Sequence, residues 1–186
     1  GSGKSIMALR IMDEYNKKYK KNTVMWLCER LDIPQKLFFE SQIYESEKDF
    51  DKNDKTIVKI EKREDGKKTL FNVIKYNVKN FKKWKNNNII NMNDFEILEF
   101  VYNKPNDWTE KINNYNGNKP LFIIINRAFM TTLSKKDNKI YRYREITKNQ
   151  PRFIIIDECH SAMAAATYKL MLHAKYNYNA YIHGLS

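Results

Sequence analysis

Two stretches of the sequence carry residue types suited to phosphate chemistry. The chain begins GSGKS, and Gly1 to Ser5 match the second half of the phosphate-binding pattern G-x-x-x-x-G-K-[ST]. Far along the chain, the hydrophobic run Ile154 to Ile156 ends in two adjacent carboxylates, Asp157 and Glu158. Phosphoryl transfer needs a cation on the phosphate oxygens and a group that orients or deprotonates the attacking water. Together the two stretches predict a site for ATP and Mg²⁺.

The residue types divide the work of such a site between them. Glycines let backbone N–H groups close around phosphates, a lysine reaches the β and γ phosphates, and a hydroxyl at the helix start binds Mg²⁺. Asp157, directly on its strand, suits the metal, and Glu158 suits the base. The predicted ATP-binding residues are Gly1, Ser2, Gly3, Lys4 and Ser5; the predicted Mg²⁺ ligands are Ser5 and Asp157; the predicted catalytic residues are Glu158 and Lys4.

A second interpretation of GSGKS is a short remnant of cloning, because many expressed proteins begin Gly-Ser-Gly. The chain would then be a non-catalytic, basic nucleic-acid-binding module. The order of the later elements favours the phosphate-binding loop: a helix begins at once, a strand ends in Asp-Glu much later, and another strand ends in Gly184 to Ser186.

The elements that must position these residues alternate between helices and buried strands. Residues 5 to 19 have the spacing of an amphipathic helix, and residues 162 to 175 have a second helical pattern. Continuous apolar runs predict strands at residues 23–28, 120–126, 152–157 and 180–185. This alternation predicts an α/β fold with an open parallel sheet flanked by helices, in which ligands bind at the carboxyl ends of the strands.

The segment from about residue 44 to 117 has a different texture and is predicted to be an insertion. Within it, the strand-like runs on both sides of Asp65-Gly66 predict a β-hairpin. Helices are expected near Pro34, carrying Leu37, Phe38 and Ile43, and at about residues 94–102 and 107–115, the last ending at Gly117. Trp84 lies among lysines in NFKKWKNNN, where it could contact bases or simply join the core.

Composition indicates the kind of partner and the compartment. Lys plus Arg number 34 against 22 Asp plus Glu, a formal net charge of +12, which attracts polyanions but is also typical of a solvated lysine-rich face. Cys28 and Cys159 have no zinc-like or disulfide spacing, which favours a reducing compartment. No run approaches a membrane span. We expect an intracellular protein with no membrane partner.

The motifs GSGKS, DECH and the terminal GLS resemble motifs I, II and III of superfamily 2 helicases of the DExH type. The resemblance implies a first RecA-like (P-loop NTPase) domain over residues 1–186, without its first strand and without the second RecA-like domain. It also implies that His160 and Ser186 couple hydrolysis to movement. WLCERLDIPQK and IIINRAFMTTL are similar to family segments along the nucleic-acid track, which implies contacts from Arg30, Asn126, Arg127 and Thr131. The lysine- and asparagine-rich composition is most similar to that of helicases of large nucleocytoplasmic DNA viruses. This resemblance would place the protein in the cytoplasm, the viral factory or the virion. A bacterium or protist with an AT-rich genome would give the same composition.

The predicted function is that of an ATP-dependent helicase or translocase core acting on DNA or RNA. A second RecA-like domain of the same parent chain would supply arginine fingers across the cleft, so this chain alone is expected to show weak or no ATPase activity. One alternative is a translocating subunit on duplex DNA that does not unwind it, as in restriction, remodelling or viral transcription. The basic binding module is another alternative, and a small-molecule P-loop kinase fits the Asp-Glu-Cys-His sequence poorly.

Overall fold

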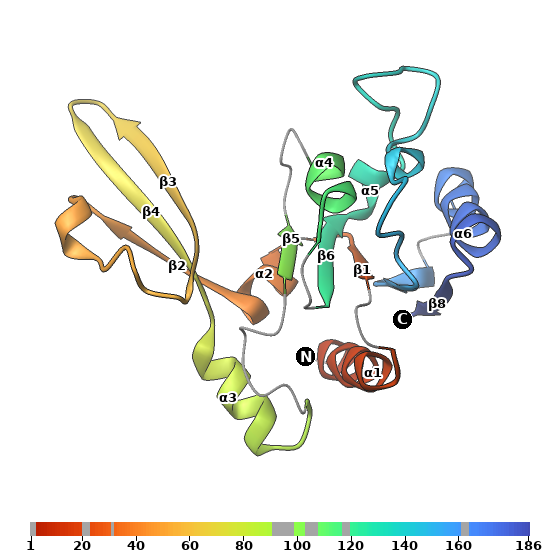
Figure 1. Ribbon diagram of the computed structural model, residues 1–186, viewed down its shortest axis with the longest axis horizontal. Helices are drawn as coiled ribbons and strands as arrows, with labels where there is room; N and C mark the ends of the chain where they lie inside the picture. The colour runs from red at the N-terminus through yellow and green to blue at the C-terminus, as the bar shows by residue number, and fades with distance from the viewer. Residues whose placement is uncertain are drawn as a thin grey trace. The chain divides into compact units, whose positions relative to one another are not determined.

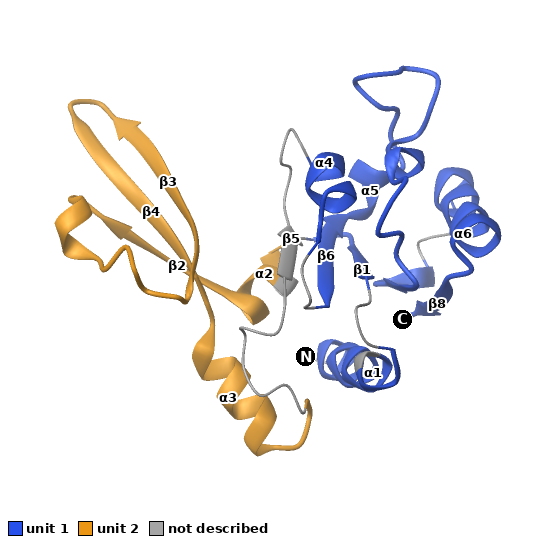
Figure 2. Cartoon of the chain, viewed as in Figure 1, with its two compact units in different colours: residues 1–31, 96–186 blue, residues 32–95 orange. Residues whose placement is uncertain are grey.

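The computed structural model describes residues 3–19, 23–30, 32–90, 99–102, 108–116, 120–160 and 164–186. The chain divides into two compact units, one of residues 1–31 and 96–186 and one of residues 32–95 (Figure 2). The second unit thus begins earlier and ends earlier than the expected insertion at about 44–117. Among the described residues, no helix combines the length and the apolar character needed to cross a bilayer.

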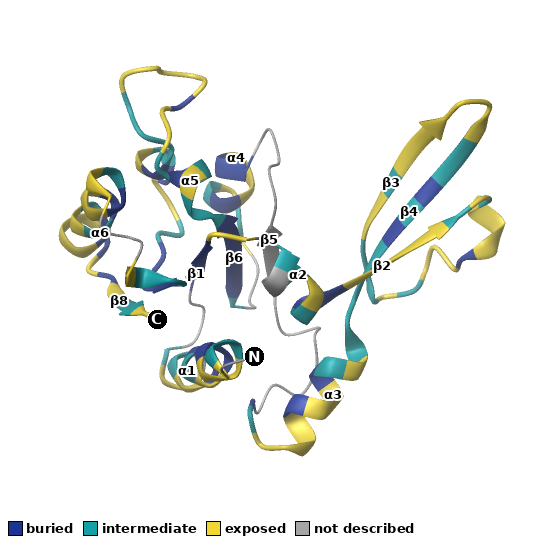
Figure 3. Cartoon of the chain, turned by 180° about the vertical axis from the view of Figure 1, so that it is seen from behind, coloured by how far each residue is buried: buried dark blue, intermediate teal, exposed yellow. Residues whose placement is uncertain are grey.

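The first unit is built on a five-stranded parallel sheet in the order β5-β6-β1-β7-β8. The strands are β1 (Thr23–Cys28), β5 (Glu99–Tyr102), β6 (Leu121–Asn126), β7 (Phe153–Ile156) and β8 (Tyr181–Gly184). The central strands β1 and β7 are buried along their whole length, as expected for strands of a sheet that is covered on both faces. Figure 3 shows β1 and β6 in the colour of buried residues. The predicted α/β fold with an open parallel sheet flanked by helices is confirmed.

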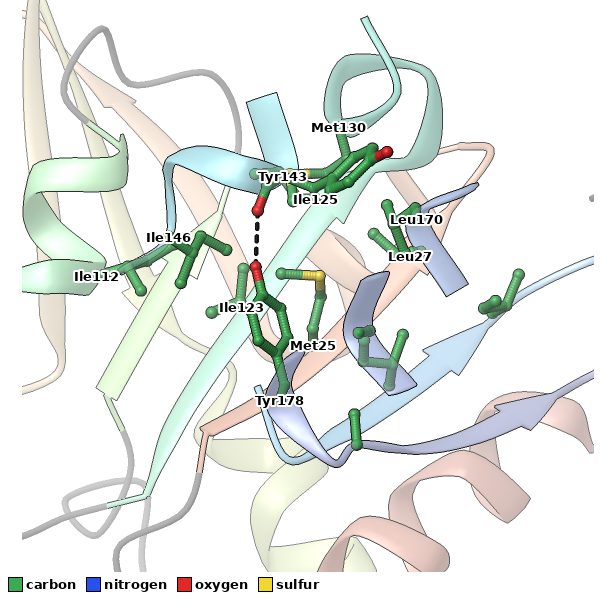
Figure 4. Packing of buried hydrophobic residues seen from close by; sticks show 14 of the residues in the cluster. Met25, Leu27, Ile112, Ile123, Ile125, Met130, Tyr143, Ile146, Leu170 and Tyr178 are labelled. Carbon is green, nitrogen blue, oxygen red and sulfur yellow. Dashed lines mark hydrogen bonds between the residues drawn. The ribbon is translucent and has the colours of Figure 1, made fainter. Parts of the chain in front are cut away.

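Helices cover both faces of this sheet (Figure 1). One face packs against α4 (Trp108–Asn113), α5 (Arg127–Met130), the 3-10 turn η3 (Arg142–Glu145) and α6 (Ala165–Tyr178). There Met25 and Leu27 meet Leu170 and Tyr178, and the Tyr178 hydroxyl donates to the carbonyl of Tyr143 at 2.8 Å (Figure 4). On the other face lies α1 (Lys4–Lys18), whose Tyr15 ring stacks on Phe153 with centroids 4.7 Å apart.

The second unit is a small antiparallel sheet with helices. Its strands β2 (Phe39–Tyr44), β3 (Ile57–Asp65) and β4 (Lys68–Tyr76) lie in the order β2-β4-β3. β3 and β4 form the predicted hairpin about Gly66. The helices are α2 (Asp32–Phe38), the 3-10 turn η1 (Glu47–Asp49) and α3 (Val78–Asn86). Phe50, Phe71 and Val73 form a separate small core on one face of the sheet.

Two expectations about this middle region were wrong. Ile43 lies on strand β2, paired with Asn72, because the helix that was expected to carry it ends at Phe38. Residues 99–102 were expected at the end of a helix but form strand β5, which pairs with β6, because so short a run fits a helix or a strand equally well and tertiary pairing decides between them. Asp94 lies outside the described residues. Of the two roles left open for Trp84, the structure shows the second: its side chain is only 3% exposed and belongs to the core. The helix expected at 107–115 is present as α4, while Gly117 lies outside the described residues.

Candidate nucleotide site

The predicted site residues lie at the carboxyl edge of the parallel sheet. β1, β6, β7 and β8 end at Cys28, Asn126, Ile156 and Gly184, and parallel strands end at the same edge. The polar residues that follow three of these strands are therefore neighbours in space: Glu29 after β1, Arg127 after β6 and Asp157 after β7. Gly1 and Ser2 lie outside the described residues.

Lys4 and Glu158 form an ion pair across 154 positions of sequence. Lys4 is the first residue of α1, and the Nζ of Lys4 donates to Oε1 of Glu158. This hydrogen bond is the largest cause of both pKa shifts: it raises the pKa of Lys4 and lowers the pKa of Glu158. The two side chains are 27% and 35% exposed, so the pair is accessible from solvent. The fold therefore brings the two predicted catalytic residues, Lys4 and Glu158, into direct contact.

The turn after β7 fixes the direction of Glu158. The Asp157 N–H donates to the carbonyl of Leu27 at 2.9 Å, and the Glu158 N–H donates to Oδ1 of Asp157 at 3.1 Å. Glu158 has φ of 48°, a left-handed conformation that costs an L-residue about 1–2 kcal/mol. Cys159 anchors the far side of the turn through its N–H, which donates to the carbonyl of Leu185 at 2.8 Å. A strained backbone held from both sides thus aims the carboxylate at Lys4.

A close approach of β8 to this turn was not foreseen from the sequence. A Cβ added at Gly184 would lie 2.8 Å from Sγ and 2.9 Å from Cβ of Cys159. Only glycine therefore allows the end of β8 to sit against the Asp-Glu-Cys-His turn. The glycine in the run Gly184 to Ser186 was the only hint of this contact in the sequence. The need for a glycine there becomes clear only once the structure shows Cys159 opposite it.

Among the described residues, no hydrogen bond joins the side chains of His160 and Ser186. Nδ1 of His160 lies 3.5 Å from Oε2 of Glu158, and the His160 side chain is 65% exposed. Ser186 is exposed, one residue beyond the Leu185 carbonyl that binds the Cys159 N–H. The two residues are thus linked through the backbone hydrogen bond between their chain neighbours, Cys159 and Leu185.

A second ion pair braces the same edge of the sheet. Nη2 of Arg127 lies 2.7 Å from Oε1 of Glu29, and Nη1 of Arg127 donates to the carbonyl of Glu158 at 3.3 Å. Asn126 donates from Nδ2 to the Glu29 carbonyl at 2.7 Å. Thr131 donates from its hydroxyl to the Arg127 carbonyl at 3.1 Å. Glu29, which was not among the predicted site residues, accepts hydrogen bonds from both Arg127 and Asn126.

The four residues expected on the nucleic-acid track differ in their surroundings. Asn126, Arg127 and Thr131 form hydrogen bonds within the protein, and the Arg127 side chain is only 11% exposed. Arg30 is exposed just beyond the end of β1. Arg30 is therefore presented to solvent, whereas the other three brace the sheet edge that supports Glu158.

The donor set fits a phosphate and a Mg²⁺ ion. In the described part of the chain, the first turn of α1 carries no acidic residue and its N-cap, Gly3, makes no side-chain cap. Backbone N–H groups of that turn, together with the Lys4 ammonium, favour an anion. The Ser5 hydroxyl and the Asp157 carboxylate are the hard oxygen ligands that Mg²⁺ prefers.

Burial raises the pKa of Asp157, and the neighbouring Glu158 charge adds to the effect. The ionised carboxylate therefore destabilises the folded chain at neutral pH, and this cost disappears as the pH falls through the raised pKa toward about 3.9, the ordinary value for aspartate. We expect Asp157→Asn to raise the Tm at pH 7, with the difference shrinking to zero near pH 4. Thermal unfolding across this pH range measures it.

The matched control is Glu158→Gln, which is expected to change stability in the opposite direction. The Lys4 hydrogen bond lowers the pKa of Glu158, so its ionised form stabilises the fold above the ordinary pKa of glutamate, and this stabilisation is lost as pH falls. Glu158→Gln should lower the Tm at pH 7. If both variants lower the Tm at pH 7, burial is not the dominant influence on Asp157; if both raise it, the Lys4 hydrogen bond does not stabilise the ionised form of Glu158.

Comparison with known proteins identifies the family. A family model described as type III restriction enzyme, res subunit, matches residues 1–186, the whole chain. No curated protein and no solved structure matches the chain. The chain belongs to this family, whose members carry the N-terminal domain of superfamily 2 helicases, and it is a helicase-family ATPase domain.

Proposed function

We propose that this member of the type III restriction enzyme res subunit family binds and hydrolyses ATP with Mg²⁺ and couples hydrolysis to movement on nucleic acid. The observation that carries the proposal is the Lys4–Glu158 pair at the carboxyl edge of the sheet, where an ammonium for phosphate meets a carboxylate for water. A structural ion pair alone would not need the strained, doubly anchored turn that holds Glu158.

Lys4 exchanges partners in this proposal. In this structure its ammonium is held by Glu158. Triphosphate oxygens attract the same ammonium more strongly than one carboxylate does, so Lys4 turns to the phosphates and releases Glu158. The pKa of the released carboxylate then returns toward its ordinary value, which makes Glu158 a better proton acceptor for the attacking water. Nucleotide binding and activation of the base thus become one event.

Ser5 and Asp157 hold the metal ion in this scheme. Mg²⁺ supplies charge neutralisation of the phosphate oxygens when it is bound. A cation beside Asp157 also favours its ionised form, which opposes the effect of burial on its pKa. The stability lost by burying this carboxylate in the folded chain is recovered only in the metal-bound state, a pattern typical of functional residues.

Coupling to nucleic acid is assigned to the residues at the ends of β1 and β6 and just after them, at the edge of the sheet. Arg30 contacts the polymer, and Asn126, Arg127 and Thr131 reach it by exchanging their present contacts with Glu29 and the local backbone. Since Arg127 also binds the Glu158 carbonyl, its movement would shift the base. His160 and Ser186 transmit the state of the site along β8, and a second RecA-like domain of the parent chain supplies arginine fingers.

The second candidate is a translocating subunit that moves on duplex DNA without separating its strands, and the family description favours it. Strand displacement distinguishes the two candidates, because such a motor hydrolyses ATP on duplex DNA and releases no strand. A non-catalytic basic module, by contrast, would bind nucleic acid equally with and without ATP.

The test is the ATPase rate of a protein that contains this chain and its second RecA-like domain, with and without single-stranded and duplex DNA and RNA. Lys4→Ala is the matched variant. Stimulation by one polymer, lost in Lys4→Ala, supports the proposal and names the preferred polymer. Turnover that is absent, or that is unchanged by Lys4→Ala, would overturn it in favour of the binding module.

A further inference from the structure

The inserted second unit carries a positively charged helix that the proposed ATPase cycle does not use. From Gly66 to Asn93 the sequence has no Asp or Glu, although acidic residues are frequent earlier in the same unit. Helix α3 (Val78–Asn86) lies in this interval with lysines at 79, 82, 83 and 85. All four lysines are exposed, and none pairs with a carboxylate among the described residues.

Three of these lysines form one face of the helix. Residues three and four apart are neighbours on a helix surface, so Lys79, Lys82 and Lys83 make a continuous lysine stripe, which the exposed Asn86 extends by one turn. Phe81 and Trp84 point the opposite way and are 5% and 3% exposed. At 1.5 Å per residue the lysine stripe is about 6 Å long, roughly two steps of 3.4 Å along one nucleic-acid strand.

Packing within the unit holds this face in place. The Trp84 and Phe81 rings lie 5.8 and 6.3 Å from the Phe38 ring, which ends α2. Asn80 donates from Nδ2 to the carbonyl of Leu37 at 3.1 Å. Asn77 caps the helix by accepting from the Asn80 N–H at 3.1 Å. The lysines are therefore displayed by a helix whose other side is fixed, which reduces the entropy lost on binding.

We propose that the lysine stripe of α3 is a second nucleic-acid contact that binds the phosphate backbone without reading sequence. The partner follows from charge complementarity: unpaired ammonium groups at helical spacing suit a row of phosphates, and lysine acts as a point charge rather than as a reader of bases. Other lysines of the unit already have a carboxylate partner, such as Lys52 with Glu47, Lys59 with Glu61 and Lys68 with Glu45. The choice of partner rests on the proposed function.

The test measures binding to a short DNA duplex, to its single strand and to the matching RNAs, without ATP, from about 50 to 200 mM salt. The full chain is compared with K79Q/K82Q/K83Q. We expect the slope of log affinity against log salt to become shallower by about 2–3 for duplex DNA, and affinity to fall about tenfold or more. The polymer with the largest change is the one that the stripe contacts.

The matched control is K52Q/K59Q/K68Q, which removes the same charge from exposed, glutamate-paired lysines of the same unit. It should leave the salt slope nearly unchanged, and K79R/K82R/K83R should retain binding. Equal losses in both glutamine triples would overturn the proposal in favour of a net-charge effect. Stronger binding of the unaltered chain to phosphatidylserine vesicles than to any nucleic acid would also overturn it. Because the binding assay contains no ATP, its result can be interpreted even if the ATPase proposal fails.

Discussion

Replacing Glu158 by Gln is expected to lower the ATP turnover number about 100- to 10,000-fold while ATP still binds, the range typical for loss of a general base. Gln keeps the size of the side chain and its position in the left-handed turn, but it cannot accept the proton from water. It also releases Lys4 from its ion pair with the Glu158 carboxylate. ATP affinity should therefore be unchanged or higher in Glu158→Gln.

Lys4→Ala is the contrasting variant, because it should fail at the binding step. Nucleotide affinity measured by titration of a fluorescent ATP analogue separates the two, and turnover is measured on the same samples with saturating nucleic acid. If Glu158→Gln loses nucleotide binding as completely as Lys4→Ala, the pair has a structural role. If Glu158→Gln keeps normal turnover, the base is another residue.

Gly184→Ala is expected to lower the turnover number about 10- to 100-fold and to destabilise the fold by about 1–3 kcal/mol, the usual cost of an added methyl group in a packed site. The new Cβ would lie within 3 Å of Cys159, so β8 and the turn that carries Glu158 must move apart. A displacement of about 1 Å at a catalytic group is enough for such a loss of rate. Tm and single-turnover hydrolysis are the measurements.

The partner residue provides the control for Gly184→Ala. Cys159→Gly removes both atoms that the new methyl group would meet, so the double variant should regain most of the turnover that the single variant loses. Cys159→Ala removes Sγ but leaves Cβ at 2.9 Å, and it should restore less. Loss of activity in Gly184→Ala with no recovery in either double variant would contradict the proposed contact.

Several features followed from the sequence alone. Continuous apolar runs such as residues 121–125 and 153–156 predict strands that are buried on both faces, because the strands of a covered parallel sheet carry apolar side chains on both sides. The parallel arrangement then follows from the helices between them. Lys4 and the Asp157-Glu158 pair were assigned to one site from their residue types, because Lys4 begins a predicted helix and the two carboxylates follow a predicted strand.

Tertiary structure decided what local patterns leave open. The short apolar run at residues 99–102 became a strand because β6 was available to pair with it, and Trp84 entered the core because Phe38 lies opposite. The role of Glu29 as the acceptor for Arg127 and Asn126 depends on the adjacency of β1 and β6. Gly184 is needed because Cys159 lies less than 3 Å from where its Cβ would be. Residue type and spacing carry the chemistry of a site, whereas only the meeting of distant segments fixes which side chains hold one another.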